Sequence, residues 1–124
     1  MPIIGGGTVT VVSGDAAPQR SNYRSGTSYE ANGVVVAAPA TLYGMTVYNN
    51  KASALYLHLY NATAVPATGT QPDWDLVVPA QASVPLFFGV DGKYFSSGIS
   101  WANSTSILTR QGGSTDFRLT AEYA

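Results

Sequence analysis

His58 carries the most versatile side chain in this sequence, and it is the only histidine. A catalytic histidine needs a carboxylate or nucleophile nearby, and a metal site needs several ligands together. His58 alternates with Tyr56 and Tyr60, and no such group lies at local spacing. We therefore expect His58 on the surface or at a subunit interface, where its titration would make assembly pH-dependent.

The closest acidic pair is Asp73 and Asp75, which flank Trp74. Two carboxylates can hold Ca²⁺ or act in glycoside hydrolysis. The further oxygen ligands that Ca²⁺ requires, and a partner that activates water, are not identifiable in the sequence. We expect instead a junction between a loop and a strand, with solvated carboxylates beside a packed tryptophan.

The remaining short motifs do not indicate an active site. Gly5-Gly6-Gly7 lacks the Lys-Ser/Thr and the helix start of a phosphate loop, so we interpret it as a hinge. Asn61 and Asn103 begin glycosylation-type triplets, but no secretion signal supports them. Cysteine is absent, which excludes disulfides and thiolate sites. The sequence therefore predicts a protein that is not an enzyme, with no catalytic residues, metal or other cofactor.

The composition favours contacts with other protein chains. The 124 residues are enough for one domain whose core needs no disulfide or metal. Only 10% of the residues are charged, against about 25% in an average soluble domain. The surface must then consist largely of Ser, Thr, Asn, Gly and Tyr, and low charge with abundant tyrosine is typical of interfaces. A Ser/Thr-rich extracellular β-domain is the alternative interpretation.

Charge and hydrophobicity also limit the classes of partner. The net charge is −1 and the six basic residues are scattered, so we expect no nucleic-acid partner. No run of about 18 apolar residues occurs, so we expect no membrane partner. The N-terminus lacks the basic and long apolar regions of a signal peptide, so we expect synthesis in a cytoplasm without export.

Eight tyrosines are the remaining candidates for binding. Aromatic rings can stack on sugars, but packing across strands and subunits is their commoner use in sheets. Ile3 and Ile4 are apolar residues in a polar N-terminal segment, and they either anchor it on a neighbouring chain or pack back onto the sandwich of their own chain. The expected subunit or partner interface consists of Ile3, Ile4, Tyr23, Tyr29, Tyr56, His58 and Tyr60.

The clearest secondary-structure signal is the alternation between Thr41 and Asn61. Leu55, Leu57 and Leu59 share one face and are expected to enter a core, which leaves a tyrosine-rich face for water or a partner. An Asn-Asn-Lys-Ala turn separates this segment from Thr41–Asn49, and we expect the two segments to form a hairpin.

Short strand patterns follow at near-regular spacing, and no window has a helical period. Pro85 interrupts one of them, which places that strand at a sheet edge or a bulge. The expected strands are residues 33–38, 41–49, 54–61, 75–78, 83–88, 98–102 and 116–123. This pattern predicts an all-β fold, an antiparallel β-sandwich of jelly-roll or Greek-key form.

Turn-forming residues dominate the N-terminal quarter and leave room for one short strand, Thr8–Ser13. We therefore expect residues 1–32 to form an extended, Gly-rich arm and residues 33–124 to form the sandwich. The expected core consists of Val35, Leu42, Val47, Leu55, Leu57, Leu59, Val77, Leu86, Phe88, Ile99, Trp101, Phe117 and Leu119.

Four segments in order, TLYGMTVYNNKASALYLHLYNATAVPATGT, VVPA, FFGVDGKYFSSGISWANS and TAEYA, carry a family resemblance. Over about residues 40–124 the chain resembles small β-sandwich virion proteins of tailed bacteriophages. The resemblance implies a head decoration (cement) protein on the capsid surface, made in the host cytoplasm. Its implied partners are the major capsid protein and copies of itself in a homotrimer.

Other functions remain compatible with the same sequence. A neck, head-fibre or tail-associated virion protein can have the same sandwich. A carbohydrate-binding module would instead use exposed tyrosines and Trp74 to stack on a glycan. The family implies no catalytic residues that carry over to this chain.

Overall fold

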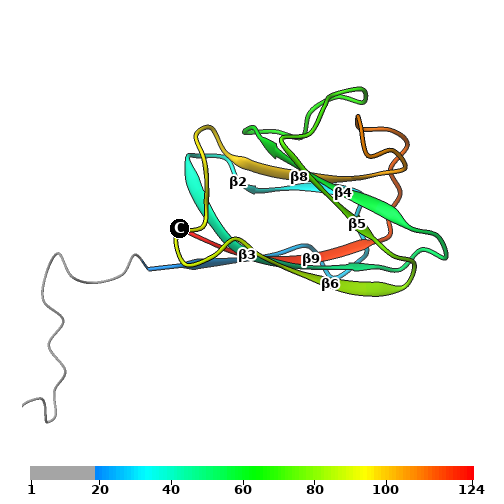
Figure 1. Cartoon of the computed structure of the whole chain (residues 1–124), viewed down its shortest axis with the longest axis horizontal. Coiled ribbons are helices and arrows are strands. Elements are labelled where there is room, and N and C mark those ends of the chain that lie inside the picture. Colours follow the sequence, from blue (N-terminus) through cyan, green and yellow to red (C-terminus); the bar gives the residue numbers. More distant parts are fainter. Residues whose placement is uncertain (1–18) are drawn as a thin grey trace, which may run out of the picture.

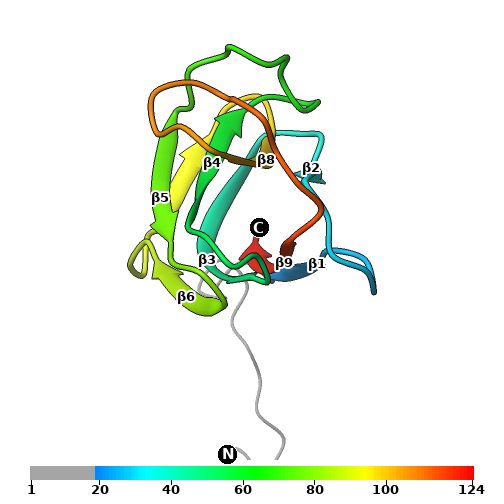
Figure 2. The same ribbon diagram turned by 90° about the vertical axis from the view of Figure 1, so that its right-hand side faces the viewer.

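The structure, a computed structural model, describes residues 19–124. These residues form two antiparallel β-sheets that face each other, with loops between the strands (Figures 1 and 2). The strands are β1 (Ser21–Arg24), β2 (Asn32–Val36), β3 (Ala40–Asn49), β4 (Leu55–Asn61), β5 (Trp74–Val78), β6 (Ala82–Phe87), β7 (Lys93–Phe95), β8 (Ile99–Ser104) and β9 (Phe117–Tyr123). Within this part of the chain, no helix is long and apolar enough to cross a membrane.

The strand order is that of a jelly roll. Sheet I has the order β1-β9-β3-β6, and sheet II has the order β2-β8-β4-β5. The short strand β7 pairs with the first residues of β3, along the edge where β6 pairs with its later residues, so β6 and β7 act as one interrupted edge strand. The chain thus fills two four-stranded layers and crosses between them repeatedly, which confirms the predicted antiparallel sandwich.

The predicted hairpin between Thr41–Asn49 and Ala54–Asn61 is wrong. Strand β3 lies in sheet I between β9 and β6, whereas β4 lies in sheet II between β8 and β5. The residues between them form a corner that carries the chain from one sheet to the other. An alternation of period two reports which face of a strand is buried, but it does not report which strand lies beside it.

Asn49 holds this corner together. Its side chain is fully buried, and its Nδ2 donates to the carbonyl oxygens of Ser53 (3.0 Å), Val78 (3.1 Å) and Pro79 (3.3 Å). Its Oδ1 accepts from the backbone N–H of Lys51 at 2.9 Å. One buried amide therefore joins the β3–β4 corner to the end of β5 in the opposite sheet.

The core lies between the sheets and matches most of the sequence prediction. Leu42 and Val47 enter it from sheet I, and the three leucines of β4 enter it from sheet II. The predicted core position Val77 is wrong, because Val77 is 47% exposed while Val78 is fully buried. The register of β5 places alternate residues outward, so an error of one position exchanges the two faces.

Two sequence expectations concern the edges of the sandwich. Pro85 lies in β6, which is an edge strand, as a residue without a backbone N–H requires. Strand β1 pairs with β9 from Ser21↔Tyr123 to Arg24↔Thr120, although it falls inside the range expected for the arm. The predicted strand Thr8–Ser13 lies outside the described residues.

Strand β1 is also tied to the core by a side chain. The indole Nε1 of Trp101 donates to the Tyr23 hydroxyl at 3.3 Å. A Cβ on Gly33 would lie 2.7 Å from that hydroxyl and 2.8 Å from the indole nitrogen, so only glycine leaves room for the bond. The hydroxyl of Tyr23, an expected interface residue, therefore points toward the core.

Candidate functional site

The two sheets differ in how their outer faces are covered. On sheet II, the outward residues of the central strands β4 and β8 are mostly buried. On sheet I, the outward residues Arg24, Thr46 and Arg118 are exposed. Figure 1 shows the loops after β4 and β8 lying above sheet II, on the side away from sheet I. The open face of sheet I is therefore the larger surface available to a partner among the described residues.

Two loops, residues 62–73 and 105–116, cover sheet II. They bond to each other where the N–H of Gly69 donates to Arg110 O (2.7 Å) and the N–H of Arg110 donates to Thr70 O (2.9 Å). The Arg110 guanidinium also donates to the carbonyl of Pro66. The Ser104 hydroxyl fixes the second loop, because it accepts from the backbone N–H of Gln111 at 2.9 Å. Neither loop has a periodic sequence pattern that predicts that it covers the outer face of sheet II.

These loops overturn one expectation from the sequence. His58 is fully buried and Tyr60 is 2% exposed, so they do not form an open tyrosine-rich face. His58 Nδ1 lies 3.2 Å from the Tyr60 hydroxyl, and Nε2 has no hydrogen-bond partner within residues 19–124. Tyr56 on the same face is half-buried. Any partner contact through His58 or Tyr60 would require the covering loops to move.

Burial lowers the pKa of His58 below its ordinary value of 6.5. The Ser106 backbone and the Asp75 carboxylate favour the charged form and Arg110 opposes it, but burial dominates. The pKa of the Tyr60 phenol is raised, also chiefly by burial. His58 is thus a neutral side chain inside the folded protein near pH 7.

Acidification is therefore expected to destabilise the fold through His58. The unfolded chain takes up the proton at about pH 6.5, while the folded chain resists it, so stability decreases as the pH falls below that value. The slope from one proton is at most about 1.4 kcal/mol per pH unit. Urea denaturation between pH 7 and pH 5 measures it, and His58→Gln is expected to flatten the profile. Equal slopes for both proteins would contradict this assignment.

The acidic pair behaves as the sequence predicted. Asp73 and Asp75 are exposed, and Trp74 packs edge-on against Phe88 with the ring centroids 5.3 Å apart. The Asp73 carboxylate accepts from the backbone N–H of Asn61 at 2.7 Å, so it anchors the start of β5. Among the residues described, no group of three or more His, Cys, Asp or Glu is placed to hold a metal.

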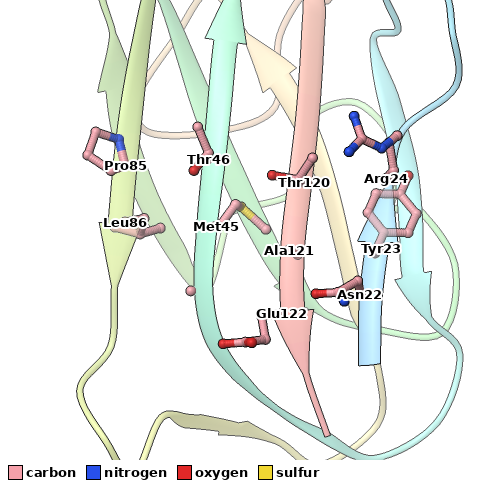
Figure 3. Close-up of a pocket in the computed structure, with 11 residues that line it drawn as sticks. Asn22, Tyr23, Arg24, Met45, Thr46, Pro85, Leu86, Thr120, Ala121 and Glu122 are labelled. Atoms are coloured by element: carbon pink, nitrogen blue, oxygen red, sulfur yellow. The ribbon is translucent and has the colours of Figure 1, made fainter. Parts of the chain in front are cut away.

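The outer face of sheet I contains a shallow hollow of about 690 Å³ across four strands (Figure 3). Its outward side chains are small where the sheet is central: Thr46 of β3 pairs with Thr120 of β9 and with Pro85 of β6. Arg24 of β1 is the next member of this row, opposite Thr120. The floor is flat because small side chains meet in register.

A second hollow of about 280 Å³ continues the first and shares Arg24, Thr46 and Thr120 with it. Its far end has the rings of Tyr29 and Tyr48, whose centroids are 6.2 Å apart. Together the two hollows form one elongated groove, which we call the sheet I groove. Its outward groups are hydroxyls, aromatic rings and guanidinium groups, together with the Glu122 carboxylate at the end away from the tyrosines.

Hydrogen bonds anchor both ends of the segment between β1 and β2, which contributes Tyr29 to this groove. Ser25 is buried, and its hydroxyl accepts from the N–H of Leu119 at 2.8 Å. The backbones of Glu30 and Phe117 exchange two hydrogen bonds, of 2.8 and 3.0 Å. Tyr29 is therefore held beside Tyr48 by contacts on both sides of it in sequence.

Charges are distributed unevenly along the groove. At one end Arg20 forms an ion pair with Glu122 (2.9 Å) and lies over the Tyr43 ring, 3.8 Å from its centroid. Toward the tyrosine end, Arg24 and Arg118 are exposed, and within residues 19–124 neither has a carboxylate at salt-bridge distance. The tyrosine end of the groove is therefore cationic on a nearly neutral protein.

An apolar rim lies next to the Arg20–Glu122 end. Phe87 at the end of β6, Val90 in the connection to β7, and Tyr94 in β7 are 72%, 80% and 65% exposed. Phe87 pairs with Gly44 and Tyr94 pairs with Thr41, so both side chains lie on the outer face of sheet I. None of the three is among the interface residues expected from the sequence.

The expected interface residues are thus dispersed rather than gathered. Tyr29 lies at the groove, and Tyr23 lines it only from below. Tyr56, His58 and Tyr60 belong to the other sheet, while Ile3 and Ile4 lie outside the described residues. The sequence could have pointed to the groove residues Arg118 and Thr120, because they alternate with the apolar residues of β9 and are therefore predicted to face outward.

Comparisons with known proteins add little to this description. No family model matches the chain, and no curated protein matches it. Among solved structures, the chain is similar to the coat protein of tobacco streak virus, with a TM-score of 0.40 and 11% identity over 90% of this chain and 88% of that one. A TM-score this low does not establish a shared fold or a shared function. The assignment of the fold therefore rests on the strand order.

Proposed function

We propose that this chain is a non-enzymatic structural protein of a tailed-phage virion, most specifically a head decoration (cement) protein. In this proposal it binds the major capsid protein on the head surface, associates with copies of itself as a homotrimer, and stabilises contacts between capsomers. It is made in the host cytoplasm and acts on the assembled head.

The open outer face of sheet I, with exposed aromatic side chains beside its groove, is the observation that carries this proposal. Its groove has a flat floor, and the Phe87 side chain nearby is 72% exposed. Aromatic side chains are enriched at the buried centres of protein interfaces. The resemblance of residues 40–124 to phage virion proteins supplies the class of partner.

The N-terminal residues enter the proposal as an additional contact. The described chain starts beside the Arg20–Tyr43 contact, at the same end of the sandwich as the C-terminus (Figure 1). Residues 1–18 contain the apolar pair Ile3 and Ile4. We propose that these residues reach a neighbouring subunit, where binding to a rigid lattice adds buried area.

Virions that lack this protein are expected to release their DNA at a lower temperature than complete virions. The reason is that each bound copy stabilises the closed capsid by mass action, as any ligand of a native state does. The measurement is DNA release on heating, followed by a dye, with purified protein added back as the control. Identical release temperatures would contradict a cement role.

Copy number distinguishes a decoration protein from its nearest alternative. Hundreds of copies per particle support decoration, whereas a dozen or fewer support a neck, head-fibre or tail location. A glycan-binding module is the second candidate, favoured by the Tyr29–Tyr48 pair beside two arginines. Binding to a glycan array without binding to virions would support that module instead.

A further inference from the structure

From Arg24 and Arg118 of the sheet I groove, which have no carboxylate partner within residues 19–124, we infer that the groove binds an extended acidic segment of a partner protein. The carboxylate of this segment lies between Arg24 and Arg118, and its neutral or apolar residues run toward Pro85. The inference specifies the contact within the proposed function and therefore rests on it.

The geometry of the two arginines carries the first step. Arg24 pairs with Thr120, and Arg118 lies two residues away from Thr120 on the same outer face of β9. The two side chains are thus diagonal neighbours on adjacent strands, at a separation that long side chains can bridge. A guanidinium binds a carboxylate in a planar, bidentate manner, so a single carboxylate can contact both groups.

The surroundings of the arginines favour a bound partner over a solvated surface. Both line the second hollow, together with the rings of Tyr29 and Tyr48 and the hydroxyl of Thr46. Arginine and tyrosine are the residues enriched at the centres of protein interfaces. Hydrogen bonds at Ser25 and Glu30 hold both ends of this segment on β9, and a contact surface that is already formed costs less to order on binding.

The length and polarity of the groove indicate a peptide segment rather than a small anion. The hollow continues across β9 and β3 to β6, so the occupant is longer than one charged group. At the far end Glu122 already pairs with Arg20, which leaves no positive charge there for a second carboxylate. The floor in between has Thr46, Gly44 and Pro85, which suit small neutral side chains.

The test uses the full chain, ¹⁵N-labelled, and the peptide acetyl-Glu-Glu-Thr-Val-Thr-Val-amide. We expect this peptide to shift the amide signals of Arg24, Thr46, Arg118 and Thr120, while the same peptide with Gln in place of both Glu does not. The variant Arg24→Gln/Arg118→Gln is expected to bind at least about tenfold more weakly. The variant Lys51→Gln/Lys93→Gln removes equal charge outside the groove and is expected to bind like the unmodified chain.

Several outcomes would overturn the inference. One is equal shifts with the Gln peptide, and another is equal weakening in the Lys51/Lys93 control. Inorganic phosphate that produces the same shifts would indicate a general anion site, and sialyllactose binding more tightly than the peptide would indicate an acidic glycan.

A virion-binding assay separates this inference from the proposed function. If the unmodified chain binds virions and Arg24→Gln/Arg118→Gln binds equally well, the groove contact is wrong and the virion role stands. If the unmodified chain does not bind virions, the proposed function fails, whatever the peptide result. If only the groove variant loses binding to virions, the result supports both the groove contact and the virion role.

Discussion

Replacing Trp101 by alanine is expected to lower the free energy of unfolding by about 3–5 kcal/mol. The indole is fully buried and stacks on Phe117, with ring centroids 6.2 Å apart and an interplanar angle of 17°. The substitution leaves a large cavity between the sheets and removes the partner of the Tyr23 hydroxyl. Urea denaturation followed by circular dichroism measures the loss.

Trp74 provides a matched control for this prediction. It is half-buried at the start of β5, so Trp74→Ala creates a smaller cavity and is expected to cost less. Trp101→Phe retains most of the volume and keeps a folded protein available if the alanine variant fails to fold. A greater loss from Trp74→Ala than from Trp101→Ala would contradict the position of the core.

Asn49→Ala is expected to cost about 2–4 kcal/mol, because each buried group that loses its hydrogen bond costs about 1–3 kcal/mol. The carbonyl of Val78 is buried at this contact, and the backbone N–H of Lys51 also loses its acceptor. The effect is large for a small polar residue because the corner joins both sheets. Thermal unfolding of the variant, compared with the exposed neighbour Asn50→Ala, measures it.

Asn49→Asp tests the direction of these hydrogen bonds. It keeps the shape but places a carboxylate oxygen against three carbonyl groups, which raises the pKa of the new side chain in the folded state. The folded variant then binds a proton more tightly than the unfolded chain, so its stability is expected to rise on acidification through that pKa. No such rise is expected for Asn49→Ala, and its absence from Asn49→Asp would contradict the amide orientation.

The sequence was reliable for the inner faces of the strands. Leu55, Leu57 and Leu59 enter the core as their alternation predicts, since burial on one face of a strand imposes a period of two. Pro85 marked an edge strand because it cannot donate a hydrogen bond. These signals are local, because each depends only on neighbouring residues and on backbone chemistry.

The sequence was unreliable wherever distant segments decide the environment. His58 alternates with tyrosines as an exposed residue would, yet loops 62–73 and 105–116 bury it. The groove is likewise assembled from β1, β9, β3 and β6, which are far apart in the chain. Arg24 and Arg118 become neighbours only through the pairing of β1 with β9.

By itself, the order of amino acids determined that this protein is a layered β-structure with particular side chains turned inward, because alternation and turn residues act within a few positions. Only the tertiary structure decided which strands are neighbours, which outer face is covered and where two arginines meet. Those outcomes depend on contacts between residues up to about a hundred positions apart, as between Arg20 and Glu122.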